Sequence, residues 1–287
     1  MERRVTMISC LNGATIGGAP PLREYIELAA KYGFGGIEFG IGEALALSKE
    51  ITQRAMIELF TKNNVAPAAF GIPVEWRRDT PKFQEDLKAL PRQARLAQEM
   101  GCTVTGTWLP PTVDQDSRYF RNQTIKRFYD IASILGDFDI RFALEWVGPY
   151  TTRKAGLDRG GQEFVWNIPA TLELIEDIGA PVNNVGLLVD SFHWFTTGAT
   201  EDDLAKLGDK IVYVHINDAP DKPRDEQIDH ERLLPGDGVI DLPGFVRSLN
   251  AAGYNGYVAV ETFNKEIAAL GRDEAARRTA ESLRGLI

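Results

Sequence analysis

Eight apolar, strand-like stretches alternate with helix-like stretches along the 287-residue chain, and this alternation limits the fold more than any other feature. The predicted strands are 5–11, 36–39, 65–70, 102–108, 140–146, 185–190, 211–215 and 257–261. Strands that alternate with helices form parallel sheets, and eight such units at this length predict a closed barrel. We therefore expect one domain over residues 1–287, an α/β fold of the (β/α)8 TIM-barrel type. An open doubly wound sheet is the alternative, but it would need a glycine-rich phosphate turn after the first strand, which residues 12–18 do not supply convincingly.

Apolar residues at helical spacing predict helices in the segments between these strands. Helices are expected over 21–32, 51–63, 81–100, 117–135, 169–178, 201–207, 242–252 and 268–286. Pro91 lies inside the third of these, where a proline predicts a kink or a break. Two long segments, 148–167 and 217–238, lack this periodicity and are expected to be irregular loops.

Charge and composition disfavour several classes of partner. The formal net charge of −9 is unfavourable for binding nucleic acid or an anionic membrane. No apolar run approaches about 20 residues, and the first residues lead into a strand without the apolar region of a signal peptide. Cys10 and Cys102 lie in apolar runs, which favours buried free thiols over a disulfide. We therefore expect a cytoplasmic protein; a homo-oligomer is compatible with the sequence, which does not determine the number of subunits.

The last four predicted strands each end in a carboxylate or an imidazole. These residues are Glu145, Asp190, His215 and Glu261. Active sites of (β/α)8 barrels lie at the carboxyl ends of the strands, and neighbouring strands are about 4.8 Å apart, so four successive ends can converge on one ion. Three carboxylates and one imidazole suit a single divalent cation such as Mn²⁺, Co²⁺, Mg²⁺ or Zn²⁺. The alternative is that each residue makes an independent structural hydrogen bond at the barrel rim.

Several motifs around these residues also carry a family resemblance. They are Asn-Gly-Ala-Thr at 12–15, Phe-Ala-Leu-Glu-Trp-Val-Gly at 142–148, Val-Gly-Leu-Leu-Val-Asp-Ser-Phe-His at 185–193, His-Ile-Asn-Asp at 215–218, Glu-Arg-Leu-Leu-Pro-Gly-Asp-Gly-Val-Ile-Asp at 231–241 and Val-Glu-Thr-Phe at 260–263. With them the chain resembles the sugar isomerase/epimerase superfamily of xylose isomerase-like TIM barrels, and within it most closely the inosose isomerase family. The resemblance covers essentially the whole chain and is strongest from Arg141 onward.

The resemblance implies roles for particular residues. Glu145, Asp190, His215 and Glu261 would bind one divalent metal ion, and Glu145 and Glu261 would also transfer protons. His193 and Arg232 would contact the substrate. The chain departs from the ketose 3-epimerases at Thr151, where those enzymes carry another substrate-binding glutamate, and its segment 150–166 is longer than in the inosose isomerase pattern.

Three more residues are candidates for binding substrate. Asn12 lies at the exit of the first strand. Glu38 ends the second strand, where it would bind a substrate hydroxyl or form a structural ion pair. Trp108, like Trp76, follows a central strand and would either wall the pocket or pack in the core.

A divalent ion beside two carboxylates suits removal of a proton next to a carbonyl group, through a metal-stabilised enediolate. Return of the proton gives epimerisation or isomerisation of a sugar or keto-polyol, which is the function we expect. Loss of a β-substituent instead gives a dehydratase or lyase acting on a cyclic keto-polyol or 3-keto sugar, which is the alternative. A DNA-repair nuclease of the endonuclease IV type is disfavoured by the presence of only three histidines and by the negative charge. A non-catalytic, metal-stabilised binding protein is the remaining rival.

Overall fold

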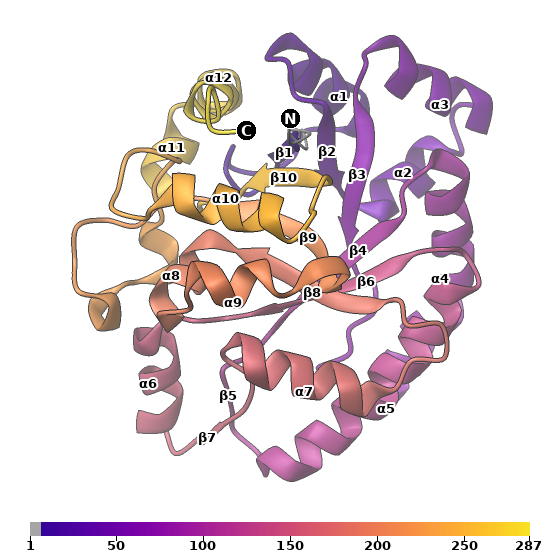
Figure 1. The fold of residues 1–287 in the computed structure, drawn as a ribbon. Coiled ribbons are helices and arrows are strands. Elements are labelled where there is room, and N and C mark those ends of the chain that lie inside the picture. The colour runs from indigo at the N-terminus through magenta and orange to yellow at the C-terminus, as the bar shows by residue number, and fades with distance from the viewer. Residues whose placement is uncertain (1–6) are drawn as a thin grey trace.

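The structure, a computed structural model, describes residues 7–287 and contains a closed barrel of eight parallel strands surrounded by helices (Figure 1). The barrel order is β1-β10-β9-β8-β6-β4-β3-β2, which closes between β1 and β2. The strands are β1 (Ile8–Asn12), β2 (Gly36–Phe39), β3 (Ala66–Gly71), β4 (Val104–Leu109), β6 (Arg141–Trp146), β8 (Val185–Asp190), β9 (Ile211–Ile216) and β10 (Tyr257–Val260). The predicted barrel is confirmed, and an open sheet is excluded. Of the first predicted strand, residues 5 and 6 lie outside the described part of the chain.

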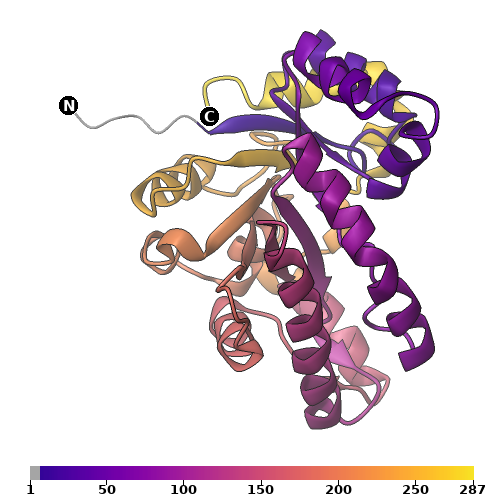
Figure 2. The ribbon, with the colours of Figure 1, turned by 90° about the vertical axis from the view of Figure 1, so that its right-hand side faces the viewer.

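Helices form the outer layer of the barrel. They are α1 (Leu22–Lys31), α2 (Ile41–Leu47), α3 (Gln53–Lys62), α4 (Thr80–Met100), α5 (Ser117–Gly136), α6 (Tyr150–Asp158), α7 (Ile168–Ile178), α8 (Ser191–Thr197), α9 (Glu201–Ala205), α10 (Leu242–Ala251), α11 (Lys265–Ala269) and α12 (Arg272–Ser282). Figure 2, turned by 90°, shows the two long helices α4 and α5 running along the outside of the barrel. Helix α4 continues through Pro91, so the predicted break there does not occur.

Helix capping explains where several of these helices begin. Thr52, Asp79, Asp116, Asn167 and Thr200 each accept a hydrogen bond from a backbone N–H in the first turn of the helix that follows. Such caps satisfy N–H groups that have no partner inside the helix. The prediction of one continuous C-terminal helix is wrong. The chain turns at Gly271, which has a φ of +84° and separates α11 from α12.

The segment 148–167 was expected to be irregular, and this expectation is wrong. Helix α6 occupies its first half, and the short strand β7 (Gln162–Glu163) pairs with β5 (Thr112–Val113). Arg153 explains why the segment is ordered: its guanidinium lies 3.7 Å from the centre of the Trp166 ring and forms an ion pair with Glu163. The segment 217–238 contains two short 3₁₀ helices, η2 (Arg224–Glu226) and η3 (Asp229–Glu231), and an isolated antiparallel bridge between Asp218 and Leu233. A third, η1 (Gly208–Lys210), precedes β9.

The inside of the barrel is filled mostly by small side chains. Cys10, Ala68, Ala69, Ala143 and Ala259 share one buried cluster inside the barrel with a few larger residues. A second, larger cluster lies between the strands and the helices. Both cysteines are buried and free, as the sequence predicted. None of the helices within residues 7–287 has the length and the apolar character needed to span a lipid bilayer.

Candidate metal centre

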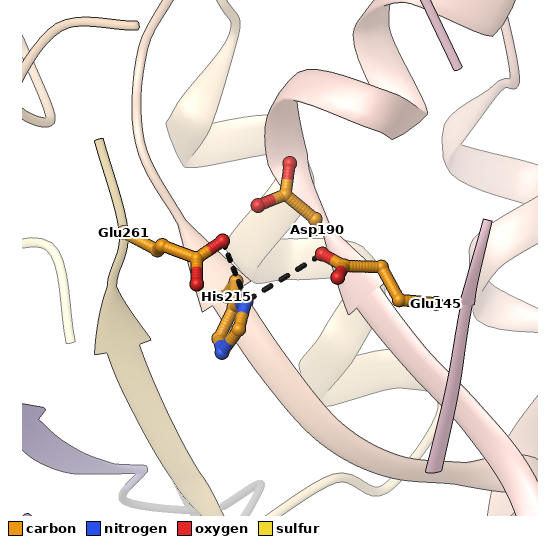
Figure 3. A group of neighbouring side chains, drawn as sticks. All are labelled: Glu145, Asp190, His215 and Glu261. Carbon is orange, nitrogen blue, oxygen red and sulfur yellow. Dashed lines mark ion pairs between the residues drawn. The ribbon is translucent and has the colours of Figure 1, made fainter. Parts of the chain in front are cut away.

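The four residues predicted as metal ligands meet at the carboxyl end of the barrel (Figure 3). They come from β6, β8, β9 and the residue that follows β10, which are four neighbours in the barrel. Asp190 and His215 are register partners on adjacent strands. One ligand atom from each of Glu145, Asp190, His215 and Glu261 lies within 4.8 Å of the other three, and all four residues are buried. The proximity expected from the sequence is therefore present.

The chemistry of these donors fits a divalent cation. Glu145 Oε1 and His215 Nδ1 are buried side-chain atoms without a hydrogen-bond partner. The His215 Nδ1 atom lies 3.5 Å from Glu145 Oε1 and 3.3 Å from Glu261 Oε2. Buried polar atoms are costly to leave unpaired, and a cation between them would satisfy both. Carboxylate and imidazole ligands together suit metals of intermediate hardness.

Electrostatics in the cluster favour positive charge. Burial raises the pKa of Glu145 above its usual range, against the opposing effect of His215. Burial alone would lower the pKa of His215, but the Glu261 and Glu38 carboxylates outweigh it and raise that pKa well above its usual value. Burial also opposes ionisation of Glu261, yet His215 and Arg232 lower its pKa to about 2. The excess of carboxylates therefore favours the binding of protons and cations in the site.

Asp190 links the cluster to helix α8. Its Oδ1 atom accepts hydrogen bonds from the backbone N–H groups of Phe192 (2.7 Å) and His193 (3.0 Å), which caps the helix. Its Oδ2 atom accepts from Asn217 Nδ2 (2.8 Å) and forms an ion pair with Arg232 Nη1 (3.1 Å). Strand β8 and the cap together place His193 beside the site, because the first turn of α8 begins directly after Asp190.

Arg232 and His193, which the resemblance assigned to substrate binding, border the cluster. Arg232 Nη1 lies 3.2 Å from Glu261 Oε2, and Arg232 Nη2 lies 3.1 Å from His193 Nε2. His193 Nε2 is also 3.8 Å from Glu145 Oε1. Gly148 permits the close approach of residue 148 to His193, because a Cβ atom at residue 148 would lie only 2.7 Å from the His193 carbonyl oxygen.

Asp229 belongs to the same group, and the sequence reasoning missed it. Its Oδ1 atom accepts a hydrogen bond from Arg232 Nη2 at 2.7 Å and lies 3.9 Å from His193 Nδ1. Burial alone would raise the pKa of Asp229, but Arg232 and His193 hold it below its usual range. The only sequence signal is the three-residue spacing between Asp229 and Arg232, inside a segment expected to be an irregular loop.

Asn12 and Glu38 contact the cluster from β1 and β2. Glu38 Oε2 lies 3.0 Å from His215 Nε2, and Asn12 Nδ2 donates to the same Glu38 oxygen at 2.9 Å. Asn12 Nδ2 also reaches Glu261 Oε1 at 3.4 Å. Of the two alternatives for Glu38, the structure shows the contact with an internal partner, the His215 imidazole, while contact with a substrate hydroxyl stays a prediction.

A cavity of about 160 Å³ opens beside the cluster. Its lining combines Glu38, Glu145, His215 and Glu261 with apolar side chains of the barrel interior and with Trp108. Trp108 remains half exposed and stacks on Arg77, whose guanidinium lies 4.0 Å from the ring centre. Trp76, by contrast, is buried against Phe128 in the core, so packing is its role.

A larger hollow of about 670 Å³ lies at the opposite end of the barrel, where α7 passes the starts of β6 and β8. None of the residues predicted as metal ligands lines it. The smaller cavity is therefore the one next to the predicted metal ligands, in agreement with the rule that barrel active sites lie at the carboxyl ends of the strands.

Comparison with known proteins identifies the family. A family model for the xylose isomerase-like TIM barrel matches residues 26–286. The chain belongs to this family. The resemblance expected from the sequence is thereby confirmed, together with the fold.

Named relatives and solved structures agree with this assignment. An inosose isomerase from Bacillus velezensis is 26% identical over 97% of this chain and 96% of its own length. A 3-dehydroshikimate dehydratase from Pseudomonas putida is 26% identical over 96% of this chain but only 40% of its own length. The structure of a xylose isomerase domain protein from Alicyclobacillus acidocaldarius is 34% identical, has a TM-score of 0.88 and covers 98% of each chain.

Proposed function

We propose that this protein is a divalent-metal-dependent isomerase or epimerase of a sugar or keto-polyol, which abstracts a proton from the carbon next to a carbonyl group. The observation that carries the proposal is the convergence of Glu145, Asp190, His215 and Glu261 beside a small cavity. That the chain is an enzyme follows from its relatives, which are named as isomerases and dehydratases. The inosose isomerase from Bacillus velezensis, matched over nearly its whole length, favours isomerisation.

The metal ligands are assigned as part of this proposal. Glu145, Asp190, His215 and Glu261 would hold one Mn²⁺, Co²⁺, Mg²⁺ or Zn²⁺ ion. When bound, such an ion acts as a Lewis acid that polarises a carbonyl group and stabilises the enediolate formed by loss of the neighbouring proton.

The chain's own side chains would move the proton. Glu145 and Glu261 approach His215 from opposite sides (Figure 3). A substrate carbon between them can lose a proton to one carboxylate and receive a proton from the other on its opposite face, which gives epimerisation. A carbonyl shift results instead when the proton returns to the former carbonyl carbon and the neighbouring hydroxyl passes its proton to the former carbonyl oxygen. Arg232 and His193 would orient the substrate oxygens by hydrogen bonds, and the half-exposed Trp108 ring would pack on its C–H face.

A second candidate function is a dehydratase or lyase that eliminates a β-substituent from the same kind of carbanion. The observation that favours it is the similarity to the 3-dehydroshikimate dehydratase of Pseudomonas putida, which covers nearly the whole of this chain. Elimination differs from isomerisation only in the step after proton removal, so the same carboxylates would serve both reactions.

One experiment tests the function and separates the two candidates. The protein is incubated with each of the four metals and a panel of ketoses, inososes and 3-keto glycosides in D₂O, and each product is examined by NMR and mass spectrometry. Isomerisation or epimerisation gives deuterium next to the carbonyl without loss of a group, whereas elimination removes water or an aglycone. Samples treated with a chelator serve as the control. A panel without deuterium uptake and without any change of mass would contradict both candidates.

Asp229 provides a prediction about substrate binding. Changing Asp229→Asn removes the charge that holds Arg232 Nη2, and hydrogen bonds to charged groups contribute about 1.5–3 kcal/mol. We expect the substrate KM to rise by about tenfold or more, with a smaller change in kcat. Asp225→Asn, an exposed residue of the same segment, is the matched control and should leave KM unchanged. An unchanged KM in Asp229→Asn would show that Arg232 does not depend on this partner.

A further inference from the structure

We propose that Glu38 is a positioning residue that fixes the tautomer of His215, so that a lone pair on Nδ1, and not a proton, faces the three carboxylates of the metal site. Glu38 is not one of the four residues proposed as ligands. The inference rests on the metal site proposed above, and its test is designed so that the two can fail separately.

The contact between Glu38 and His215 determines which nitrogen carries the proton. Glu38 Oε2 lies 3.0 Å from His215 Nε2. An ionised carboxylate only accepts hydrogen bonds, so the imidazole must be the donor and Nε2 must be protonated. In a neutral imidazole one nitrogen carries a proton and the other accepts. Nδ1 is then the free acceptor.

The other side of the ring fits this assignment when a metal cation, and not a proton, lies between Nδ1 and the carboxylates. Nδ1 of His215 is buried, has no hydrogen-bond partner and lies within 3.5 Å of oxygens from both Glu145 and Glu261. The two nitrogens therefore have separate surroundings: Nε2 contacts Glu38, and Nδ1 faces the group of proposed ligands (Figure 3).

Asn12 holds Glu38 in the position that this role requires. Asn12 and Glu38 are register partners on β1 and β2, and Asn12 Nδ2 donates to Glu38 Oε2 at 2.9 Å. The Asn12 amide is itself oriented, because its Oδ1 atom accepts a hydrogen bond from the Ala14 N–H at 2.7 Å. One Glu38 oxygen therefore accepts two hydrogen bonds, one from Asn12 and one from His215.

Metal affinity of two Glu38 variants tests the inference, with Zn²⁺ and Mn²⁺ dissociation constants measured by titration calorimetry on the purified protein. Glu38→Gln keeps an oxygen acceptor but loses the charge, whereas Glu38→Met has a similar length and no acceptor. Loss of the partner of a metal-binding histidine costs roughly 10–100-fold in metal affinity. We expect such a loss in Glu38→Met and at most a small change in Glu38→Gln. Glu43→Met, an exposed residue of α2, is the matched control.

The order of the variants decides between positioning and charge. If Glu38→Gln and Glu38→Met lose affinity equally, Glu38 acts only through its charge and the inference is wrong. If neither loses affinity, the inference is also wrong. A wild-type protein that binds neither ion would contradict the proposed metal site.

A direct measurement of the tautomer covers the cases in which a variant fails to fold or no metal binds. The ¹⁵N chemical shifts of the three histidines are recorded in the Zn²⁺-loaded wild type, or in the metal-free protein at a pH where His215 is neutral. A proton on Nε2 of His215 supports the inference, and a proton on Nδ1 overturns it.

Discussion

Replacing Glu261 by glutamine is expected to slow deuterium exchange at the substrate carbon next to the carbonyl group by about 10²–10⁴-fold, the range that positioned general acids and bases contribute. Glutamine is close to glutamate in size and retains one oxygen, but its neutral amide cannot accept the proton. Exchange is measured by NMR in D₂O at saturating metal, so that any weaker metal binding does not limit the rate.

The surroundings of Glu261 place it at the cavity and keep it ionised. The residue is 9% exposed and lines the cavity, and its Oε2 atom lies 3.3 Å from His215 Nδ1 and 3.2 Å from Arg232 Nη1. Both neighbours favour the ionised carboxylate, which is the form that can take up a proton. Glu145 also lines the cavity, with its Oε1 atom 3.5 Å from His215 Nδ1, and it would return the proton.

Two controls accompany this variant. Glu266→Gln makes the same chemical change at an exposed residue of α11 and should exchange deuterium like the wild type. Glu145→Gln should retain exchange if Glu261 alone removes the proton, and should slow it if the two carboxylates act in either order. Exchange at the wild-type rate in Glu261→Gln would remove Glu261 from the role of base.

Much of the site was predictable from the sequence because the barrel repeats one geometry. Each strand surfaces at the same end, so a polar residue that ends an apolar run must lie at the rim. This reasoning located Glu145, Asp190, His215 and Glu261 without any information on their contacts. The assignments of Arg232 and His193 came from the family resemblance alone, and the structure adds that Arg232 contacts two of the four proposed ligands.

The sequence did not predict the helices and the site residue that depend on tertiary contacts. Helix α6 lacks a clear apolar face, and the contacts of Arg153 with Trp166 and Glu163 stabilise the region. Helix α8 begins with Ser-Phe-His-Trp-Phe at 191–195, which lacks helical spacing, and its cap is Asp190, already assigned to the strand. Asp229 was missed because a solvated loop residue and a partly buried ion-pair partner cannot be told apart from the sequence.

The structural role of Asp190 leads to the second prediction with a large effect. Asp190→Ala is expected to lower the free energy of unfolding of the metal-free protein by roughly 3–5 kcal/mol, the cost of removing one partner of a buried ion pair. The side chain is fully buried, and its two oxygens contact the N–H groups of Phe192 and His193, the Asn217 amide and Arg232. Alanine leaves the Phe192 and His193 N–H groups without this acceptor. Asn217 Nδ2 and Arg232 Nη1 each lose one acceptor and keep their contacts with Glu261.

The relief of electrostatic repulsion between carboxylates opposes this loss of stability. Removing Asp190 takes one negative charge away from Glu145 and Glu261, which stabilises the metal-free protein. Hydrogen bonding outweighs this gain, because four donors lose an acceptor while the remaining carboxylates keep His215 and Arg232 as cationic partners.

Asp190→Asn separates the two effects, since asparagine can still accept the hydrogen bonds that cap α8 but carries no charge. We expect this variant to recover only the capping part of the lost stability, because its carbonyl oxygen can serve Phe192 and His193 as Oδ1 does in the wild type. Its NH2 group would instead face the Asn217 and Arg232 donors and cannot replace the ion pair. Chemical denaturation with a chelator present measures both variants against the wild type. An Asp190→Ala protein that is as stable as the wild type would mean that Asp190 serves only the metal, and that α8 does not need its cap.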